Sequence, residues 1–326
     1  MSVANPFQRI GARSSGMAAW ALLALMVPST IYSLLYRSPF ALHLLGYALL
    51  GMLTEAAYTW VLKRKMRLSN MGSGLTAALL AASVPTSMPF LPMLFAILIA
   101  VGLVKLPLAG APLRLNAAMA GRLFLMLVYP SHIVNWGTPT ADVISTATPQ
   151  ELYRSESFAL EWPQLLFGRI EGTWEGLFLL VPGSPGETFP VLLLLLGMLL
   201  CWKGIMAWRT PLAFLLSFGI ATALFGNSPL FDLCSAATIF SAVFIVSDPV
   251  STPMSKGGKI ACGIIIGVSN ALIRNVTYYT EAIVYAVLIG NLCAPLLDRI
   301  AFEWQGRRLA KRMDSRAGVD GASSSV

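Results

Sequence analysis

Residues 231–251 read Phe-Asp-Leu-Cys-Ser-Ala-Ala-Thr-Ile-Phe-Ser-Ala-Val-Phe-Ile-Val-Ser-Asp-Pro-Val-Ser. The stretch begins near Asp232 and ends on Asp248 after an apolar span. Its first half holds four small residues in a row: Ser235, Ala236, Ala237 and Thr238. Small side chains leave space beside the backbone for a bulky group, and Thr238 places a hydroxyl at the edge of that space. The pattern predicts one short membrane helix from about residue 232 to residue 246.

Asp248 stands at the end of this apolar span, directly before Pro249. A carboxylate within a membrane helix costs about 2.5–3.5 kcal/mol on insertion scales, so it usually serves a purpose. Two interpretations remain open. Asp248 binds a cation or a proton on a translocation path, or it forms a turn with Pro249 in contact with water.

The composition extends the membrane prediction to the whole chain. Of its 326 residues, 56% are hydrophobic and 12% are charged, whereas soluble domains average about 25% charged residues. Long apolar runs recur from end to end, which is typical of a polytopic helical membrane protein. The net charge of +8 comes from basic residues between apolar spans and in the tail, where membrane topology places them. We therefore predict no binding of nucleic acid.

The apolar runs predict an all-α fold of about ten transmembrane helices. Basic clusters, beginning with Lys63, Arg64, Lys65 and Arg67, fall on one side, which the positive-inside rule makes cytoplasmic. The expected location is the bacterial inner membrane, with both termini in the cytoplasm. The expected parts are a cytoplasmic N-terminus (1–16), a first membrane half of five helices (17–130), an extracytoplasmic insertion (131–188), a second half of five helices (189–299) and a basic cytoplasmic tail (300–326) that ends in a disordered, Ser-rich segment.

An internal repeat relates the two halves. Ser73-Gly74-Leu75-Thr76 matches Ser235-Ala236-Ala237-Thr238, and 83–87 echoes 247–251 further downstream. Each match falls on the third span of a set of five. Because an odd number of spans inverts the second half, the chain is expected to form two inverted five-helix repeats, a design shared by many transporters.

The opening stretch resembles the flavin-attachment region of the D subunit of the Rnf electron-transport complex and of the related B subunit of the sodium-translocating NADH:quinone oxidoreductase (Nqr). That family joins FMN to the threonine of a Ser-Gly-Ala-Thr motif, often with an Asp six residues earlier. Asp232, Ser235, Ala237 and Thr238 fit this motif, while Ala236 replaces the glycine. The family's Thr-Asp-Pro-Val-Thr run is similar to 247–251 of this chain.

The resemblance implies a membrane flavoprotein that carries FMN as a phosphoester on Thr238 and has no catalytic residue of its own. Arg274 is expected to contact the phosphate, or to pair with Glu281. Asp232 is expected to cap the helix, to be recognised by a flavin transferase, or both. The chain would belong to a redox-driven translocase that couples electron flow to Na⁺ or H⁺ movement. Its implied partners are membrane lipid, the flavin transferase, and other membrane and peripheral subunits, including a second flavin subunit and iron–sulfur subunits.

Two other interpretations fit the same residues. The chain is a solute channel or transporter of the same inverted-repeat fold, or it is a structural membrane subunit that lost its flavin through Ala236. Thr238 would then only bond back to a carbonyl in the preceding turn, as helix threonines commonly do. The four cysteines form no Cys-x-x-Cys pair, so we predict no metal site built by this chain alone.

Overall fold

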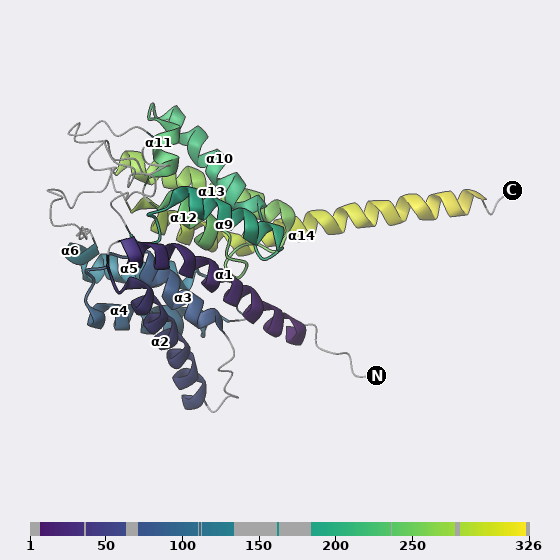
Figure 1. Cartoon of the computed structure of the whole chain (residues 1–326). Coiled ribbons are helices and arrows are strands. Elements are labelled where there is room, and N and C mark those ends of the chain that lie inside the picture. The colour runs from purple at the N-terminus through teal and green to yellow at the C-terminus, as the bar shows by residue number, and fades with distance from the viewer. Residues whose placement is uncertain are drawn as a thin grey trace.

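The computed structural model describes residues 7–35, 37–62, 71–109, 111, 113–133, 162, 184–235, 237–277 and 281–323, and every regular element within them is a helix. The basic cluster at 63–67, Ala236 and most of the predicted insertion at 131–188 lie outside these residues. The all-α prediction is confirmed for the described part of the chain (Figure 1).

Four helices contain segments long and apolar enough to cross a membrane. These segments are Gly16–Leu34, Phe40–Val61, Lys256–Val276 and Ala282–Gln305. They belong respectively to α1 (Phe7–Leu35), α2 (Phe40–Val61), α13 (Lys256–Val276) and α14 (Ala282–Ser323). Their number and apolar character agree with a multi-pass membrane protein.

Shorter apolar helices lie between these four. They are α3 (Met71–Ala82), α4 (Phe90–Ile97) with its π-helical continuation η1 (Leu98–Lys105), α5 (Ala117–Val128), α9 (Pro190–Trp202) and α10 (Arg209–Leu224). The one-turn helix α6 (Pro130–Ile133) follows α5. The count of ten crossings and their inverted arrangement remain predictions.

The eighth predicted span is interrupted in the structure. Instead of one helix over 232–246, the chain forms α11 (Pro229–Cys234), a break, α12 (Thr238–Phe240) and the π-helix η3 (Ser241–Ile245). At the break Ala237 adopts a left-handed conformation, with φ 58° and ψ 13°. One residue of that kind redirects the chain and prevents a continuous right-handed helix.

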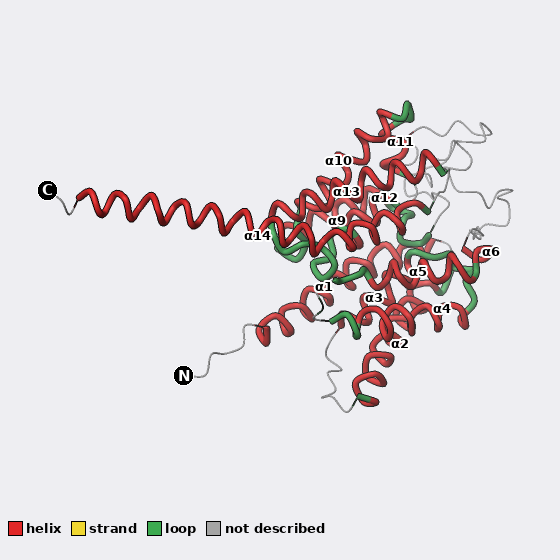
Figure 2. The backbone as a smooth tube through the Cα atoms, turned by 180° about the vertical axis from the view of Figure 1, so that it is seen from behind, coloured by secondary structure: helices red, strands yellow, loops and turns green. Residues whose placement is uncertain are grey.

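The helices form two groups that follow the predicted halves. In Figures 1 and 2, α1 to α5 lie together on one side, and α9 to α13 lie on the other with the first part of α14. Within the second group α13 packs against both α10 and α14, while α5 against α14 and α1 against α9 join the groups. Thr188 and Phe189 are buried just ahead of α9, and the Gly186 N–H donates to the Ala82 carbonyl at the end of α3 (2.9 Å). The end of the predicted insertion is therefore built into the junction between the halves.

Two glycines let α10 and α13 approach closely. A Cβ at Gly263 would lie 2.5 Å from the Thr210 carbonyl oxygen, and one at Gly267 would lie 2.7 Å from the Phe214 carbonyl oxygen. The contacts advance in the same direction along both helices, so α10 and α13 run parallel. Small residues at helix contacts are the usual device for close packing in membranes.

The last helix, α14, runs for 42 residues to Ser323 and extends away from the helix groups (Figures 1 and 2). The Ser-rich end that was predicted to be disordered lies almost wholly beyond Ser323, outside the described residues. Residues 299–323 include five Arg and four Ala, which are good helix formers. The helix at the other end begins earlier than expected, at Phe7 rather than near Met17.

Candidate functional site

Four residues around the break in the eighth span form what we call the Thr238 cluster: Asp232, Ser235, Thr238 and Arg274. All four are buried. Asp232 comes from α11, Ser235 and Thr238 flank the left-handed residue, and Arg274 lies on the last turns of α13. The structure thus brings together the residues that the sequence singled out, with Arg274 contributed from a separate helix.

Arg274 holds the two sides of the break together. Its Nη1 donates to the Asp232 carbonyl oxygen (3.2 Å) and lies 3.6 Å from the Asp232 carboxylate, while its Nη2 donates to Thr238 Oγ1 (3.3 Å). The guanidinium carbon stacks 4.8 Å from the centre of the Phe218 ring. A planar, five-donor guanidinium suits such simultaneous contacts. Arg274 is fully buried, so these contacts compensate for the cost of removing its charge from water.

Asp232 does not cap the eighth helix. Ser228 is the N-cap of α11 and accepts from the Phe231 N–H, and Ala237 occupies the N-cap position of α12. Asp232 instead lies inside α11 and faces Arg274. The capping expectation was wrong because the span is broken, which moves the helix start upstream of Asp232. Recognition of Asp232 by a flavin transferase stays a prediction.

The Thr238 hydroxyl is enclosed by the protein. It lies within hydrogen-bonding distance of the carbonyl oxygens of Ser235 (2.8 Å) and Asp232 (3.2 Å), and the residue is 1% exposed. The carbonyl contact that the sequence offered as the alternative to flavin attachment is therefore present. The neighbouring guanidinium has the right chemistry for a phosphate, but the burial of the hydroxyl does not fit attack by a separate transferase.

A second group of charged residues, the Arg122 cluster, adjoins the first. Arg122 of α5 and Glu281, just ahead of α14, form a buried ion pair between the two halves. Glu187 lies in the same electrostatic environment, accepts from Ser184 Oγ, and accepts from the Ala237 N–H beside Thr238. Glu281 thus pairs with Arg122, whereas the carboxylate facing Arg274 belongs to Asp232.

Glu187 belongs to the Arg122 cluster and was not predicted from the sequence. Burial raises the pKa of its carboxyl group to about 7; Arg122 and the hydrogen bonds from Ser184 and Ala237 oppose the rise, and Glu281 adds to it. A signal did exist in the sequence, because Glu187 is the last acidic residue before the apolar run that starts at Pro190. Nothing in that position, however, indicated a contact with α5.

A third group, the Asp248 cluster, joins the halves at the other end of η3. The Asp248 carboxylate accepts from Ser251 Oγ (2.8 Å), the Val250 N–H (3.1 Å) and Asn116 Nδ2 (3.5 Å). Asn291 of α14 accepts from the Asn116 N–H (2.7 Å) and donates to the Ser251 carbonyl oxygen (3.1 Å). The bond from Val250 forms a turn, as one of the two sequence interpretations of Asp248 expects, and the amides of Asn116 and Asn291 were not predicted.

The repeat seen in the sequence recurs in these contacts. Lys105 Nζ donates to Thr76 Oγ1 (3.1 Å), as Arg274 Nη2 donates to Thr238 Oγ1 (3.3 Å). Thr76 and Thr238 are the aligned threonines of the two repeats. Each half therefore places a cation from its fourth predicted span against the threonine of its third. Lys105 also interacts electrostatically with Glu55 and Asp248.

The sequence contains a second match to the flavin motif, which lies outside the apolar spans. Ser145-Thr146-Ala147-Thr148 has the spacing of the family's Ser-Gly-Ala-Thr, with Asp142 six residues before Thr148. It departs from the motif at the same position as the first match, where Thr146 replaces the glycine. These residues lie within the predicted insertion and outside the described part of the structure. A comparison of the motif with the whole chain, rather than with the apolar spans alone, would have found it.

The fold and the three clusters define a class: a multi-helix membrane protein with buried ion pairs, one of which joins its two halves. The model of the NQR2, RnfD, RnfE family matches residues 1–304. The chain belongs to this family, and the resemblance stated from the sequence is confirmed.

Curated relatives match over most of their length. The D subunit of the Na⁺-translocating ferredoxin:NAD⁺ oxidoreductase complex of Acetobacterium woodii is 29% identical over 253 residues, 77% of each chain. The D subunit of the proton-translocating ferredoxin:NAD⁺ oxidoreductase complex of Clostridium ljungdahlii is 26% identical over 298 residues, 86% of this chain and 88% of the relative. The B subunit of the Na⁺-translocating NADH-quinone reductase of Azotobacter vinelandii is 31% identical over 287 residues, 81% of this chain and 68% of the relative.

Proposed function

We propose that this chain is the membrane subunit of an Rnf-type ion-translocating oxidoreductase complex, and that it passes electrons between partner subunits while Na⁺ or H⁺ crosses the membrane. The observation that carries the proposal is the family match over residues 1–304. The names of the relatives describe subunits of translocating oxidoreductases. The chain would be inactive alone, because its electrons come from and go to other subunits, including a second flavin subunit and iron–sulfur subunits.

The proposed electron carrier is FMN, held as a phosphoester on a threonine. A covalent tether keeps the cofactor at a high effective concentration without altering its ring, and the flavin supplies the redox chemistry when bound. The chain's own part is to hold the phosphate and to set the surroundings of the ring. Of the described residues, Arg274 is the one whose donors suit a phosphate beside Thr238.

Two threonines compete for the attachment. The resemblance nominates Thr238, and the hydrogen bond from Arg274 supports it. The 1% exposure of Thr238 and the engagement of its hydroxyl by two carbonyl groups favour Thr148, which belongs to the extracytoplasmic insertion predicted from the sequence. A transferase needs access to the hydroxyl that it modifies, so we regard Thr148 as the stronger candidate.

The experiment is to express the complex with its flavin transferase, denature it, and record in-gel ultraviolet fluorescence of this chain for the wild type, Thr148→Ala and Thr238→Ala. Loss of fluorescence in Thr148→Ala, with an FMN mass on the 142–154 peptide, assigns the flavin there. Loss in Thr238→Ala, with the FMN mass on the Thr238 peptide, assigns it to the original site. A wild-type chain without a fluorescent band, from material that retains its partners, would leave only the structural-subunit interpretation.

The Asp248 cluster is the proposed part of the ion path. The Asp248 carboxylate lies at the junction of the two halves, where it accepts from Asn116 Nδ2 and Ser251 Oγ, and Lys105 interacts electrostatically with it and with Glu55. Asp248→Asn in the reconstituted complex is expected to reduce ion uptake per electron transferred. Glu303→Gln, on the exposed part of α14, is the matched carboxylate control. Unchanged uptake in Asp248→Asn would remove Asp248 from the path.

Either Na⁺ or H⁺ fits as the coupling ion, because the relatives include both sodium- and proton-translocating complexes. The proposed location is the bacterial inner membrane, with both termini in the cytoplasm. Cysteine labelling at positions 5 and 320 in intact and in opened cells tests this orientation.

A further inference from the structure

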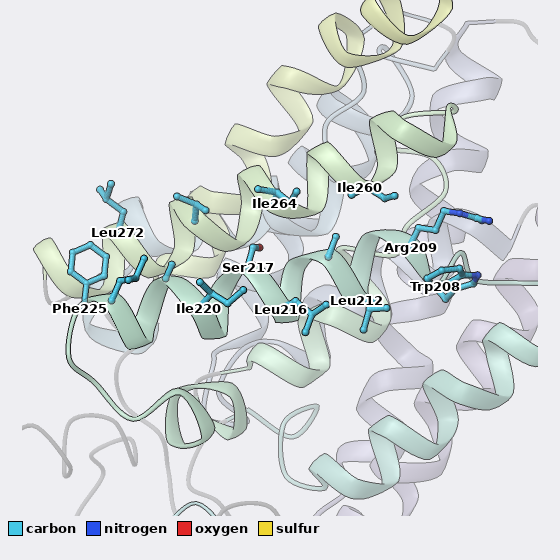
Figure 3. Close-up of a pocket in the computed structure, with 14 residues that line it drawn as sticks. Trp208, Arg209, Leu212, Leu216, Ser217, Ile220, Phe225, Ile260, Ile264 and Leu272 are labelled. Atoms are coloured by element: carbon cyan, nitrogen blue, oxygen red, sulfur yellow. The ribbon is translucent and has the colours of Figure 1, made fainter. Parts of the chain in front are cut away.

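One exposed side of α10 and α13 carries two parallel rows of aliphatic side chains. Leu212, Leu216 and Ile220 of α10 face Ile260, Ile264 and Leu272 of α13, and all six are at least 40% exposed. In each helix the rows follow a four-residue spacing, so they lie on one face. Between them runs an apolar groove of about 680 Å³, with Ser217 as its central polar side chain (Figure 3).

The groove ends differently at its two mouths. Figure 3 shows Trp208 and Arg209 at one end and Phe225 and Leu272 at the other. The Arg209 guanidinium stacks 4.8 Å from the Trp208 ring centre. Lys259, one turn into α13, interacts electrostatically with Arg209. Asp298 is the carboxylate that acts on Lys259, and its oxygens accept from the Met254 and Ser255 N–H groups. Two cations against one carboxylate leave this mouth positively charged.

The groove is long enough for an acyl chain. The 16 residues of α10 span about 24 Å at 1.5 Å per residue. The lining over this length is almost entirely apolar, which suits a hydrocarbon chain.

We propose that this groove binds an anionic phospholipid, with its phosphate at Arg209 and Lys259 and an acyl chain along the rows of aliphatic side chains. Three features support this occupant: the positive mouth, the tryptophan beside it, and the apolar groove that leads away from it. Basic pockets between transmembrane helices commonly bind anionic headgroups, and tryptophan is enriched at the level of the headgroups. The proposal is independent of the flavin and of the ion path.

The test uses the full complex, purified in detergent and stripped of lipid, to which phosphatidylglycerol, phosphatidylcholine or inorganic phosphate is added. The readouts are lipid retained in native mass spectrometry and the thermal unfolding midpoint. Phosphatidylglycerol is expected to bind and to raise the midpoint by several degrees, while phosphatidylcholine and phosphate are not. In Arg209→Gln/Lys259→Gln the affinity should fall tenfold or more, because each cation near an anionic lipid surface contributes about 1 kcal/mol.

A second variant separates lipid from protein as the occupant. Leu216→Trp fills the groove and is expected to abolish lipid retention without loss of partner subunits. Arg299→Gln and Leu49→Trp are the controls, one for an exposed cation and one for an exposed aliphatic side chain on α2. Equal binding of phosphatidylcholine, a response to phosphate alone, unchanged binding in the double variant, or loss of partner subunits from Leu216→Trp with lipid still retained would each overturn the proposal.

Discussion

Arg122 and Glu281 lie 159 positions apart in the chain and form a buried ion pair between its two halves. Removing one member of a buried pair leaves an uncompensated charge, at a cost of about 3–5 kcal/mol. Arg122→Gln is therefore expected to lower the thermal unfolding midpoint of the purified protein strongly. Replacing both residues, as Arg122→Met with Glu281→Leu, should recover much of the loss because neither member of the pair is left without its partner.

The control for that prediction is an exposed pair of the same chemistry. Arg299 and Glu303 interact at 3.1 Å one turn apart on α14, with side chains 77% and 52% exposed. Such surface pairs contribute about 0–1 kcal/mol, so Arg299→Gln should leave the midpoint nearly unchanged. If Arg122→Gln were as mild as Arg299→Gln, the pair would not hold the halves together.

The raised pKa of Glu187 predicts how the stability of the fold depends on pH. Its pKa is raised from 4.5 to about 7, mainly by burial, so the folded protein binds a proton more tightly there than the unfolded chain does. The stability that this provides is present in full below pH 4.5 and is lost as the pH rises through about 7. Unfolding midpoints between pH 5 and pH 8 should fall with pH in the wild type, and less steeply in Glu187→Gln. Parallel curves for the two proteins would contradict the assignment.

The sequence predicted the positions of the helices better than the partners of the charged residues inside them. Pro190, which begins α9, lies within one residue of the predicted start of the second half. A charge inside a span is visible in the sequence, but its partner is not. Arg274 was expected to contact a phosphate or Glu281, yet the packing of α13 sets it against Asp232, and Glu281 pairs with Arg122 of α5.

The candidate site shows the same limit. Thr238 and Asp232 were singled out as parts of one motif, and the structure sets Arg274 against both of them. The broken span was not predictable, because alanine gives no local signal for the left-handed conformation that Ala237 adopts. The break in turn buries the Thr238 hydroxyl, so its accessibility depends on a backbone angle that the sequence does not reveal.

Ala237 supplies a prediction of its own. A non-glycine residue in the left-handed region is strained by about 1–2 kcal/mol, because its Cβ crowds the backbone. Ala237→Gly is expected to stabilise the protein by up to about 1 kcal/mol, since glycine adopts that conformation freely but loses more entropy on folding. Ala242→Gly, five residues on in the right-handed η3, should instead destabilise it by about 1 kcal/mol. Equal effects at the two positions would argue against a left-handed Ala237.

The close approach of α10 and α13 gives the last prediction, and one helix provides both test and control. A Cβ at Gly267 would collide with Ser217 Oγ and lie 2.7 Å from the Phe214 carbonyl oxygen, whereas one at Gly257 meets nothing within 4 Å. Gly267→Ala must push the helices apart, and overpacking of this kind typically costs about 1–3 kcal/mol. Gly257→Ala relieves the entropic penalty of glycine in a helix and should be neutral or stabilising by up to about 1 kcal/mol. Because the groove lies between these two helices, Gly267→Ala should also weaken the binding of phosphatidylglycerol, and Gly257→Ala should not. A Gly267→Ala protein with wild-type stability and lipid binding would show that the two helices are not packed through this glycine.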